Sequence, residues 1–156
     1  MPKFSGNDTV LRAAYPHRTR IAARWNDLDV FGHVNNAIYY EYFDSVINGY
    51  LIEAGGNNPS TDGTMQFCVE NRCQYYRELG FPQTIEAGLR VAKLGTSSVC
   101  YDLALFAENT PEPVALGYFV HVFVARTDRQ PVPIPTPLRD ALRHLLVEPT
   151  TANRLD

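Results

Sequence analysis

The sequence predicts a single α+β domain in which an antiparallel sheet covers one long helix. Three observations support this class. Residues 36–54 carry apolar side chains at helical spacing over a very wide face. One strand pattern precedes this helix, and four long strand patterns follow it. Because so wide an apolar surface needs cover from other structure, we expect the sheet to wrap around the helix.

The elements are expected in the following order. A first strand spans 17–25, and a polar loop over 26–35 leads into the helix at 36–54. Asn35 is a suitable N-cap, because its side chain can accept a free backbone N–H of the first turn. Gly55 and Gly56 are typical of a helix C-terminus. The apolar stripe of the helix is formed by Tyr39, Phe43, Val46, Ile47, Tyr50, Leu51 and Ala54, with Ile38 and Tyr42 beside it.

Everything after the loop at 57–63 is predicted as strand, apart from the C-terminal region. The expected strands are 65–76, with an irregularity near Asn71, 83–94, 98–107 and 113–126. Prolines at every second position from 131 to 137 predict an extended connector that cannot pair as a central strand. A short terminal helix is predicted at 138–147.

The length of 156 residues suits one domain. Apolar residues make up 45% and charged residues 20% of the chain, an ordinary globular balance. We expect a flexible N-terminal segment over 1–16, a single domain over 17–148 and a C-terminal tail over 149–156. The chain shows no internal repeat and no low-complexity tract.

Charge and hydropathy exclude several classes of partner. The net charge is −3 and no basic run occurs, so nucleic acid is not expected to bind. No apolar run reaches the roughly 18 residues of a membrane span, and the first ten residues lack the apolar middle of a secretory signal. Three cysteines without CxxC spacing predict free thiols in a reducing cytoplasm.

The most informative segment is 29–36, which packs an acid, a glycine, a histidine and two asparagines directly before the apolar helix. This order places polar, reactive groups at a helix N-terminus, where free N–H groups and the helix dipole favour negative charge. Catalysis is the expected reason for such an arrangement. Asp27, two residues earlier, is expected to bind loop backbone or solvent.

This segment resembles the hot-dog thioesterases, in particular the 4-hydroxybenzoyl-CoA thioesterase and acyl-CoA thioester hydrolase branch. The motif that carries the resemblance is Trp25-Asn26-Asp27-Leu28-Asp29, then Gly32-His33-Val34-Asn35-Asn36, then Tyr39 and Tyr42-Phe43. Later segments agree in type, and together they cover residues 17–147. The resemblance implies a five-stranded antiparallel sheet around a central helix and a homodimer with sheets joined edge to edge, often assembled into tetramers. It also implies active sites built from both chains, and acyl thioesters of coenzyme A or acyl carrier protein as substrates.

The resemblance assigns the catalytic roles by position. Asp29 matches the catalytic carboxylate, which acts either as a base on water or as a nucleophile. The backbone N–H of Asn36 matches the donor to the thioester carbonyl. His33 is expected to orient Asp29 or to bond the thioester, and Gly32 to let the substrate approach. Asn35 is expected to cap the helix, with a substrate contact as the alternative.

Some positions depart from related enzymes. Gln74, which is expected to contact the substrate, stands where plant acyl-ACP thioesterases place an acid, and Phe31 stands where they have an amide. The turn Thr96, Ser97 and Ser98 stands where some relatives carry basic residues for coenzyme A, and Lys93 is the nearest cation here. We expect the hydroxyls and turn N–H groups to contact the substrate, with a nucleotide that remains in solvent as the alternative. Asp44, inside the helix, is a reserve catalytic candidate. His121 is expected to be a core or interface histidine. No metal and no separate cofactor is predicted.

We therefore expect an acyl-CoA thioesterase that hydrolyses a fatty or aromatic acyl thioester. A non-catalytic binder of acyl-CoA or acyl-ACP is the first alternative. A hydratase or dehydratase of the same fold is the second; its usual loop carries a proline between the acid and the histidine, and 30–32 here contains none.

Overall fold

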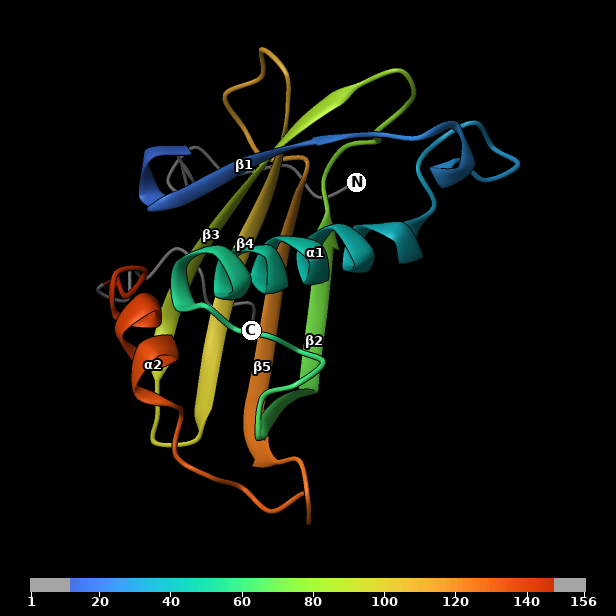
Figure 1. The fold of residues 1–156 in the computed structure, drawn as a ribbon. Coiled ribbons are helices and arrows are strands. Elements are labelled where there is room, and N and C mark those ends of the chain that lie inside the picture. The colour runs from blue at the N-terminus through green and yellow to red at the C-terminus, as the bar shows by residue number, and fades with distance from the viewer. Residues whose placement is uncertain (1–11, 148–156) are drawn as a thin grey trace.

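The computed structural model describes residues 12–147, and the expected architecture is confirmed within them: a five-stranded antiparallel sheet, a long central helix and a short C-terminal helix (Figure 1). The elements are the 3-10 turns η1 (Arg12–Ala14) and η2 (Trp25–Asp27), the helices α1 (Asn36–Gly55) and α2 (Thr136–Arg143), and the strands β1 (His17–Ala22), β2 (Thr64–Tyr75), β3 (Thr84–Leu94), β4 (Ser98–Ala107) and β5 (Ala115–Ala125). The predicted tail at 149–156 lies outside the described residues.

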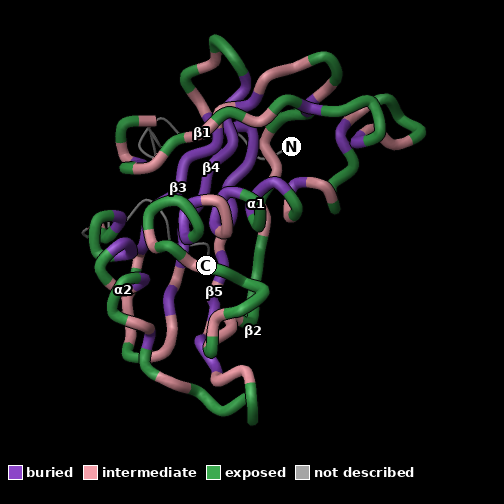
Figure 2. The backbone as a smooth tube through the Cα atoms, viewed as in Figure 1, coloured by how far each residue is buried: buried purple, intermediate pink, exposed green. Residues whose placement is uncertain are grey.

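The strands follow the order β1-β3-β4-β5-β2, and every neighbouring pair is antiparallel. The register between β2 and β5 shifts between Cys68 and Glu70, slightly before the irregularity expected near Asn71. β2 forms one edge of the sheet and is exposed along much of its length (Figure 2). Phe67 and Val69 on this edge strand are 41% and 61% exposed, which is high for large apolar side chains.

Helix α1 crosses one face of the sheet, and its apolar stripe forms the core against it (Figure 1). The buried helical residues are Tyr39, Tyr42, Phe43, Val46, Ile47, Tyr50 and Leu51. Tyr42 therefore belongs to the stripe itself, whereas Ala54, expected in it, is exposed. The close approach of helix and sheet depends on Gly117 of β5, because a Cβ there would lie 2.8 Å from the Phe43 ring.

The opposite face of the sheet is covered in part by the segment before β1. Tyr15 is 2% exposed and packs edge-on against Phe106 at a centroid distance of 6.2 Å. Gly88 makes room for it, since a Cβ would lie 2.6 Å from the Tyr15 ring. The expectation that all of 1–16 is flexible is therefore corrected for η1 and Tyr15, while residues 1–11 lie outside the described part.

Helix α2 starts two residues before the predicted 138 and ends at Arg143. Its Leu138 packs on Gly55 of α1, and the Tyr50 hydroxyl donates to the Ala141 carbonyl at 2.6 Å. These contacts close the C-terminal end of α1 and leave its N-terminal end open. Neither helix is long and apolar enough to span a membrane.

Candidate active site at the start of the central helix

Residues 29–33 form a tight turn that presents the Asp29 carboxylate. The Asp29 N–H donates to the His33 carbonyl at 2.9 Å, and the Gly32 N–H donates to the Asp29 carbonyl at 3.1 Å. The Phe31 N–H donates to Oδ1 of Asp29, also at 2.9 Å. Gly32 has φ +81°, in the left-handed region that favours glycine. The turn therefore orients the carboxylate with backbone groups alone, and Gly32 is required by the turn's geometry.

The buried carboxylate of Asp27 binds the backbone that leads into this turn and a side chain of α1. Asp27 is 1% exposed, and its Oδ2 accepts from the Tyr42 hydroxyl at 2.6 Å and from the Arg24 N–H at 2.8 Å. Burial raises the pKa of Asp27, but the hydrogen bonds from Tyr42 and Arg24 outweigh it, so the pKa lies below its ordinary value. The Asp27 carbonyl also accepts from the Asn35 N–H at 2.9 Å. Asp27 is thus a structural anchor that binds loop backbone, as expected, and a tyrosine of α1.

The N-terminus of α1 supplies backbone donors beside the turn. The Asn35 side chain accepts from the Ala37 N–H at 2.9 Å, which makes Asn35 the N-cap. The N–H of Asn36 has no backbone acceptor within residues 12–147. The Tyr75 hydroxyl donates to the Asn36 carbonyl at 2.9 Å and so fixes the first helical residue against β2. An oriented, unpaired N–H at a helix start is a donor site for a carbonyl oxygen or an anion.

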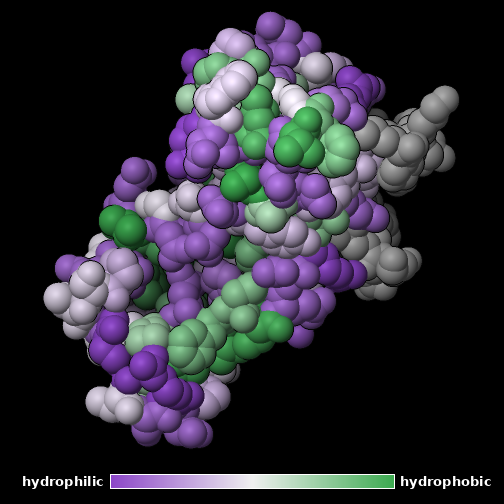
Figure 3. Space-filling view, turned by 90° about the vertical axis from the view of Figure 1, so that its right-hand side faces the viewer, coloured by the Kyte–Doolittle hydropathy of each residue, from purple (hydrophilic) through white to green (hydrophobic). Residues whose placement is uncertain are grey.

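A cavity of about 440 Å³ opens between this turn, the start of α1 and the end of β2. Its lining residues are Asp29, Phe31, His33, Val34, Asn36, Tyr39, Tyr75, Arg77 and Glu78. On the side where the 25–35 loop and β2 lie, the surface is hollowed and carries strongly apolar beside strongly hydrophilic side chains (Figure 3). The cavity therefore combines ionisable groups with an aromatic wall.

Two tyrosines build that wall. The rings of Tyr39 and Tyr75 pack edge to face at a centroid distance of 4.9 Å. Burial raises the pKa of Tyr39 to about 12, so this hydroxyl is neutral at physiological pH. Tyr39 belongs to the core and also lines the cavity, whereas Tyr42, Phe43 and Tyr50 belong to the core alone. The wall suits an apolar or aromatic acyl group.

The His33 ring lies in the cavity but makes no hydrogen bond to the Asp29 carboxylate. Its Nε2 is 2.9 Å from Oε2 of Glu78, and both side chains are about half exposed. Tyr75, Arg77 and Glu78 were not predicted as site residues, because 75–78 is far from 29–36 along the chain. The pairing of β2 with β5, the packing of α1 and the hydrogen bond from the Val34 N–H to the Leu79 carbonyl bring these segments together.

Comparison with known proteins identifies the family. A model of the thioesterase-like superfamily matches residues 23–142, more than half of the chain. The chain belongs to the thioesterase-like superfamily. It is 51% identical to the PA5185 protein of Pseudomonas aeruginosa, whose crystal structure aligns with a TM-score of 0.85 over 87% of this chain and 95% of that one.

Two more distant proteins are also similar. The uncharacterised protein YsmA of Bacillus subtilis is 23% identical over 85% of this chain and 89% of its own. Slr0204 of Synechocystis, a 1,4-dihydroxy-2-naphthoyl-CoA thioesterase, is 15% identical, with a TM-score of 0.74 over 81% of this chain and 94% of that one. The likeness to Slr0204 concerns the fold alone.

In this thioesterase-like chain, none of the six residues predicted to contact the substrate lines the cavity. Gly32 and Asn35 are sequence neighbours of lining residues, whereas the other four lie away from the cavity. Gln74 precedes Tyr75 on β2 and so faces the other side of the sheet, where its Oε1 accepts from the Tyr76 hydroxyl at 2.8 Å. Thr96, Ser97 and Ser98 lie at the turn between β3 and β4. Arg139 of α2 donates to the carbonyls of Gly95 and Thr96 at 2.6 and 2.8 Å. A cation that was not predicted, in addition to Lys93, therefore contacts this turn.

The reserve candidate Asp44 belongs to a polar chain under α1, outside the cavity. His121 Nδ1 is 2.9 Å from Oε1 of Gln66, the Gln66 amide donates to Oδ1 of Asn48 at 2.9 Å, and the Asn48 amide donates to Asp44 at 3.2 Å. His121 is 2% exposed, and burial lowers its pKa to about 4. The negative charge of Asp44 raises this pKa, but by less than burial lowers it. The histidine is therefore neutral and buried in the core, as expected.

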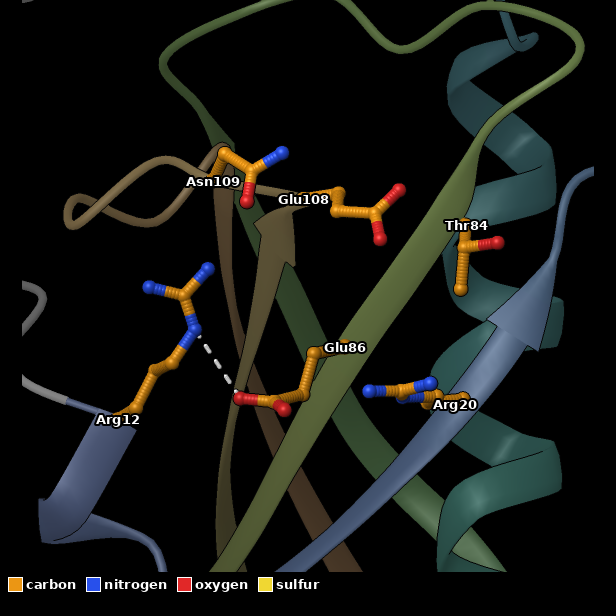
Figure 4. Close-up of a pocket in the computed structure, with 6 residues that line it drawn as sticks. All are labelled: Arg12, Arg20, Thr84, Glu86, Glu108 and Asn109. Atoms are coloured by element: carbon orange, nitrogen blue, oxygen red, sulfur yellow. Dashed lines mark ion pairs between the residues drawn. The ribbon is translucent and has the colours of Figure 1, made fainter.

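A second hollow, of about 310 Å³, lies at the far side of the sheet between β1, β3 and the β4–β5 turn (Figure 4). Arg12 and Arg20 approach Glu86 from opposite sides in this view, and Nε of Arg12 is 3.0 Å from Oε1 of Glu86. Arg12 also donates to the Ala107 carbonyl at 2.9 Å. Because these contacts tie η1 to the sheet, we interpret the hollow as structural. Within residues 12–147 no cluster of side chains suits a metal ion.

Proposed function

We propose that this protein is an acyl-CoA thioesterase that hydrolyses a fatty or aromatic acyl thioester to a free acid and a thiol. One observation carries the proposal. The carboxylate of Asp29 and the unpaired N–H of Asn36 border the same cavity, at the N-terminus of a 20-residue helix. Hydrolysis of a thioester needs a base or a nucleophile near the carbonyl carbon, a role that a carboxylate can fill, and a donor near the carbonyl oxygen.

The geometry suggests how each group acts. The Asn36 N–H binds the thioester carbonyl oxygen, and the helix dipole adds to the stabilisation of the negative charge that develops there. One such donor is typically worth about 3 kcal/mol in the transition state. Asp29 either removes a proton from the attacking water or attacks the carbonyl carbon itself. Gly32 leaves the turn without a side chain, and the space around its Cβ position is open.

The cavity wall supports the substrate class. Phe31, Tyr39 and Tyr75 provide apolar ring surface, and about 440 Å³ is large enough for an aromatic or medium-length acyl group. Coenzyme A is the proposed thiol carrier, in keeping with the coenzyme A substrate of Slr0204. Thr96, Ser97 and Ser98, with the neighbouring Arg139, are the proposed contacts for its polar end. Gln74, on the opposite face of the sheet, has no direct role in this proposal.

Homo-oligomerisation is part of the proposal. β2 is a 12-residue edge strand with Phe67 and Val69 exposed, and long apolar edges are normally covered in stable proteins. Pairing of two β2 edges in a homodimer would cover these residues. Among residues 12–147 of one chain, the β3–β4 turn does not line the cavity, and such a homodimer would give the turn of one chain a route to the cavity of the other.

Thiol release from a panel of acyl-CoA substrates tests the function. The wild-type protein is expected to release coenzyme A from at least one aliphatic or aromatic member. Asp29→Asn should lower turnover at least about a hundredfold while the protein still folds. Asp44→Asn, on α1 and outside the cavity, is the matched control and should retain activity. Saturable acyl-CoA binding without thiol release would instead support the non-catalytic binder, and full activity of Asp29→Asn would refute the site.

A further inference from the structure

The cavity holds a second pair of ionisable groups that the proposed chemistry does not yet use. Nε2 of His33 lies 2.9 Å from Oε2 of Glu78, and both residues line the same cavity as Asp29. An inference from this pair rests on the proposed thioesterase function. Glu78 comes from the segment after β2, whereas His33 and Asp29 share one turn.

Backbone contacts fix the distance between the two segments. The Val34 N–H donates to the Leu79 carbonyl at 2.8 Å, directly beside the His33–Glu78 contact. Leu79 is 1% exposed, so the segment is anchored in the core. Buried neighbours thus hold the backbone of Glu78 opposite that of His33.

The contact with Glu78 determines which nitrogen of His33 carries the proton. A carboxylate only accepts hydrogen bonds, so Nε2 must carry a hydrogen to donate to it. In the neutral imidazole Nδ1 is then an acceptor with a free lone pair. Nδ1 has no hydrogen-bond partner in the described part of the chain. Glu78 therefore leaves one acceptor atom of His33 unused at the cavity.

Asp29 also has one acceptor atom without a hydrogen-bond partner among residues 12–147. Oδ1 accepts from the Phe31 N–H, while Oδ2 has no partner among residues 12–147. One turn therefore offers two free acceptors, Oδ2 of Asp29 and Nδ1 of His33, and its ends are joined by the hydrogen bond from the Asp29 N–H to the His33 carbonyl. A water molecule has two O–H groups to donate, and an oxygen lone pair remains for attack.

We propose that Glu78 is a positioning residue that holds His33 as the Nε2–H tautomer, so that Asp29 and His33 together orient the attacking water. The water oxygen forms a bond to the carbonyl carbon as one of its protons passes to Asp29. The carbon–sulfur bond then breaks with its electron pair on sulfur, and the proton on Asp29 passes to the thiolate. His33 accepts a hydrogen bond throughout and keeps its own proton. Asp29 is thereby assigned the role of general base.

Three variants test the role of Glu78. Glu78→Ala should lower kcat about tenfold and change KM less than twofold, because the loss concerns the water and not substrate binding. Glu78→Gln should restore most of kcat, since its amide oxygen still accepts from Nε2–H. Glu41→Ala removes a comparably exposed carboxylate from α1, outside the cavity, and should match the wild type.

Nitrogen NMR of histidine-labelled protein gives a readout that a merely structural role would not move. The wild type and Glu78→Gln should show a protonated Nε2 and an unprotonated Nδ1 at His33, and Glu78→Ala a mixture of tautomers. Unchanged kcat in Glu78→Ala, or an Nδ1–H tautomer in the wild type, would overturn the inference. If instead the wild type releases no thiol, the thioesterase proposal fails, and the NMR spectrum still decides whether Glu78 sets the tautomer.

Discussion

The N–H of Phe31 donates to Oδ1 of Asp29 at 2.9 Å, within a turn that only a positive φ at Gly32 can close. The orientation of the candidate catalytic carboxylate therefore depends on the backbone of the two residues that follow it. This dependence makes the turn open to a test by substitutions that do not touch the carboxylate.

Gly32→Ala should lower both stability and turnover. An alanine at φ +81° costs about 1–2 kcal/mol, although its Cβ would meet no atom within 4 Å. Turnover should fall about tenfold as the carboxylate loses its orientation. Gly49→Ala is the control, because Gly49 lies inside α1 with equally free space. The same substitution there should raise stability by about 0.5–1 kcal/mol. Denaturant unfolding compares the two, and a shift of the same sign in both would contradict the account of the turn.

Asn35→Ala should destabilise the protein by about 1 kcal/mol, because the Ala37 N–H loses its acceptor at the N-terminus of α1. Turnover should also fall, since Asn35 holds the first turn that presents the Asn36 N–H. Asn35→Asp retains a capping oxygen and should keep both properties near the wild-type values. If the alanine and aspartate variants unfold at the same denaturant concentration, Asn35 is not the cap.

Tyr42→Phe should cost about 1–3 kcal/mol of stability, because the buried Asp27 carboxylate loses a donor at 2.6 Å. Tyr40→Phe, two residues earlier on α1, removes a hydroxyl that makes no hydrogen bond among residues 12–147 and should have little effect. Chemical denaturation measures both variants. Equal midpoints for the two would show that Tyr42 does not support Asp27.

Stability should decrease as the pH falls from about 6.5 to 4, in part because of His121. Burial lowers the pKa of His121 to about 4, against 6.5 for an unperturbed histidine. The unfolded chain therefore binds the proton first, so this contribution is complete above pH 6.5 and is lost toward pH 4. It amounts to about 3 kcal/mol.

His121→Gln should flatten the pH dependence of the free energy of unfolding between pH 6.5 and 4. His144→Gln, an exposed residue after α2, should leave that dependence as in the wild type. Equal slopes for His121→Gln and the wild type would contradict the assignment to His121.

The elements that the sequence predicted well are those with a local signal. The start of α1 at Asn36 follows from the Asn35 cap, and its end follows from Gly56, which adopts φ +66°. The strand pattern at 98–107 matches β4 at both ends. β1 ends at Ala22, three residues before the predicted end, because the η2 turn around the buried Asp27 begins at Trp25. A turn held by the buried Asp27 carboxylate produces no periodic pattern of apolar residues in the sequence.

Of the candidate site, only the residues that are close together in the chain were predicted. Asp29, His33 and Asn36 line one cavity, as their closeness in the chain suggests. Tyr75 and Glu78 reach the same cavity through the pairing of β2 with β5, which a single sequence does not specify. For the same reason the strand alternation that carries Tyr75 into the cavity turns Gln74 away from it.

A crystal structure with a non-hydrolysable acyl-CoA analogue tests the central claim most directly. We expect the carbonyl oxygen of the analogue within hydrogen-bond distance of the Asn36 N–H, the Asp29 carboxylate facing the carbonyl carbon, and the acyl group against Tyr39 and Tyr75. An analogue bound elsewhere, or an Asp29 carboxylate turned toward bulk solvent beside a bound thioester, would contradict the account.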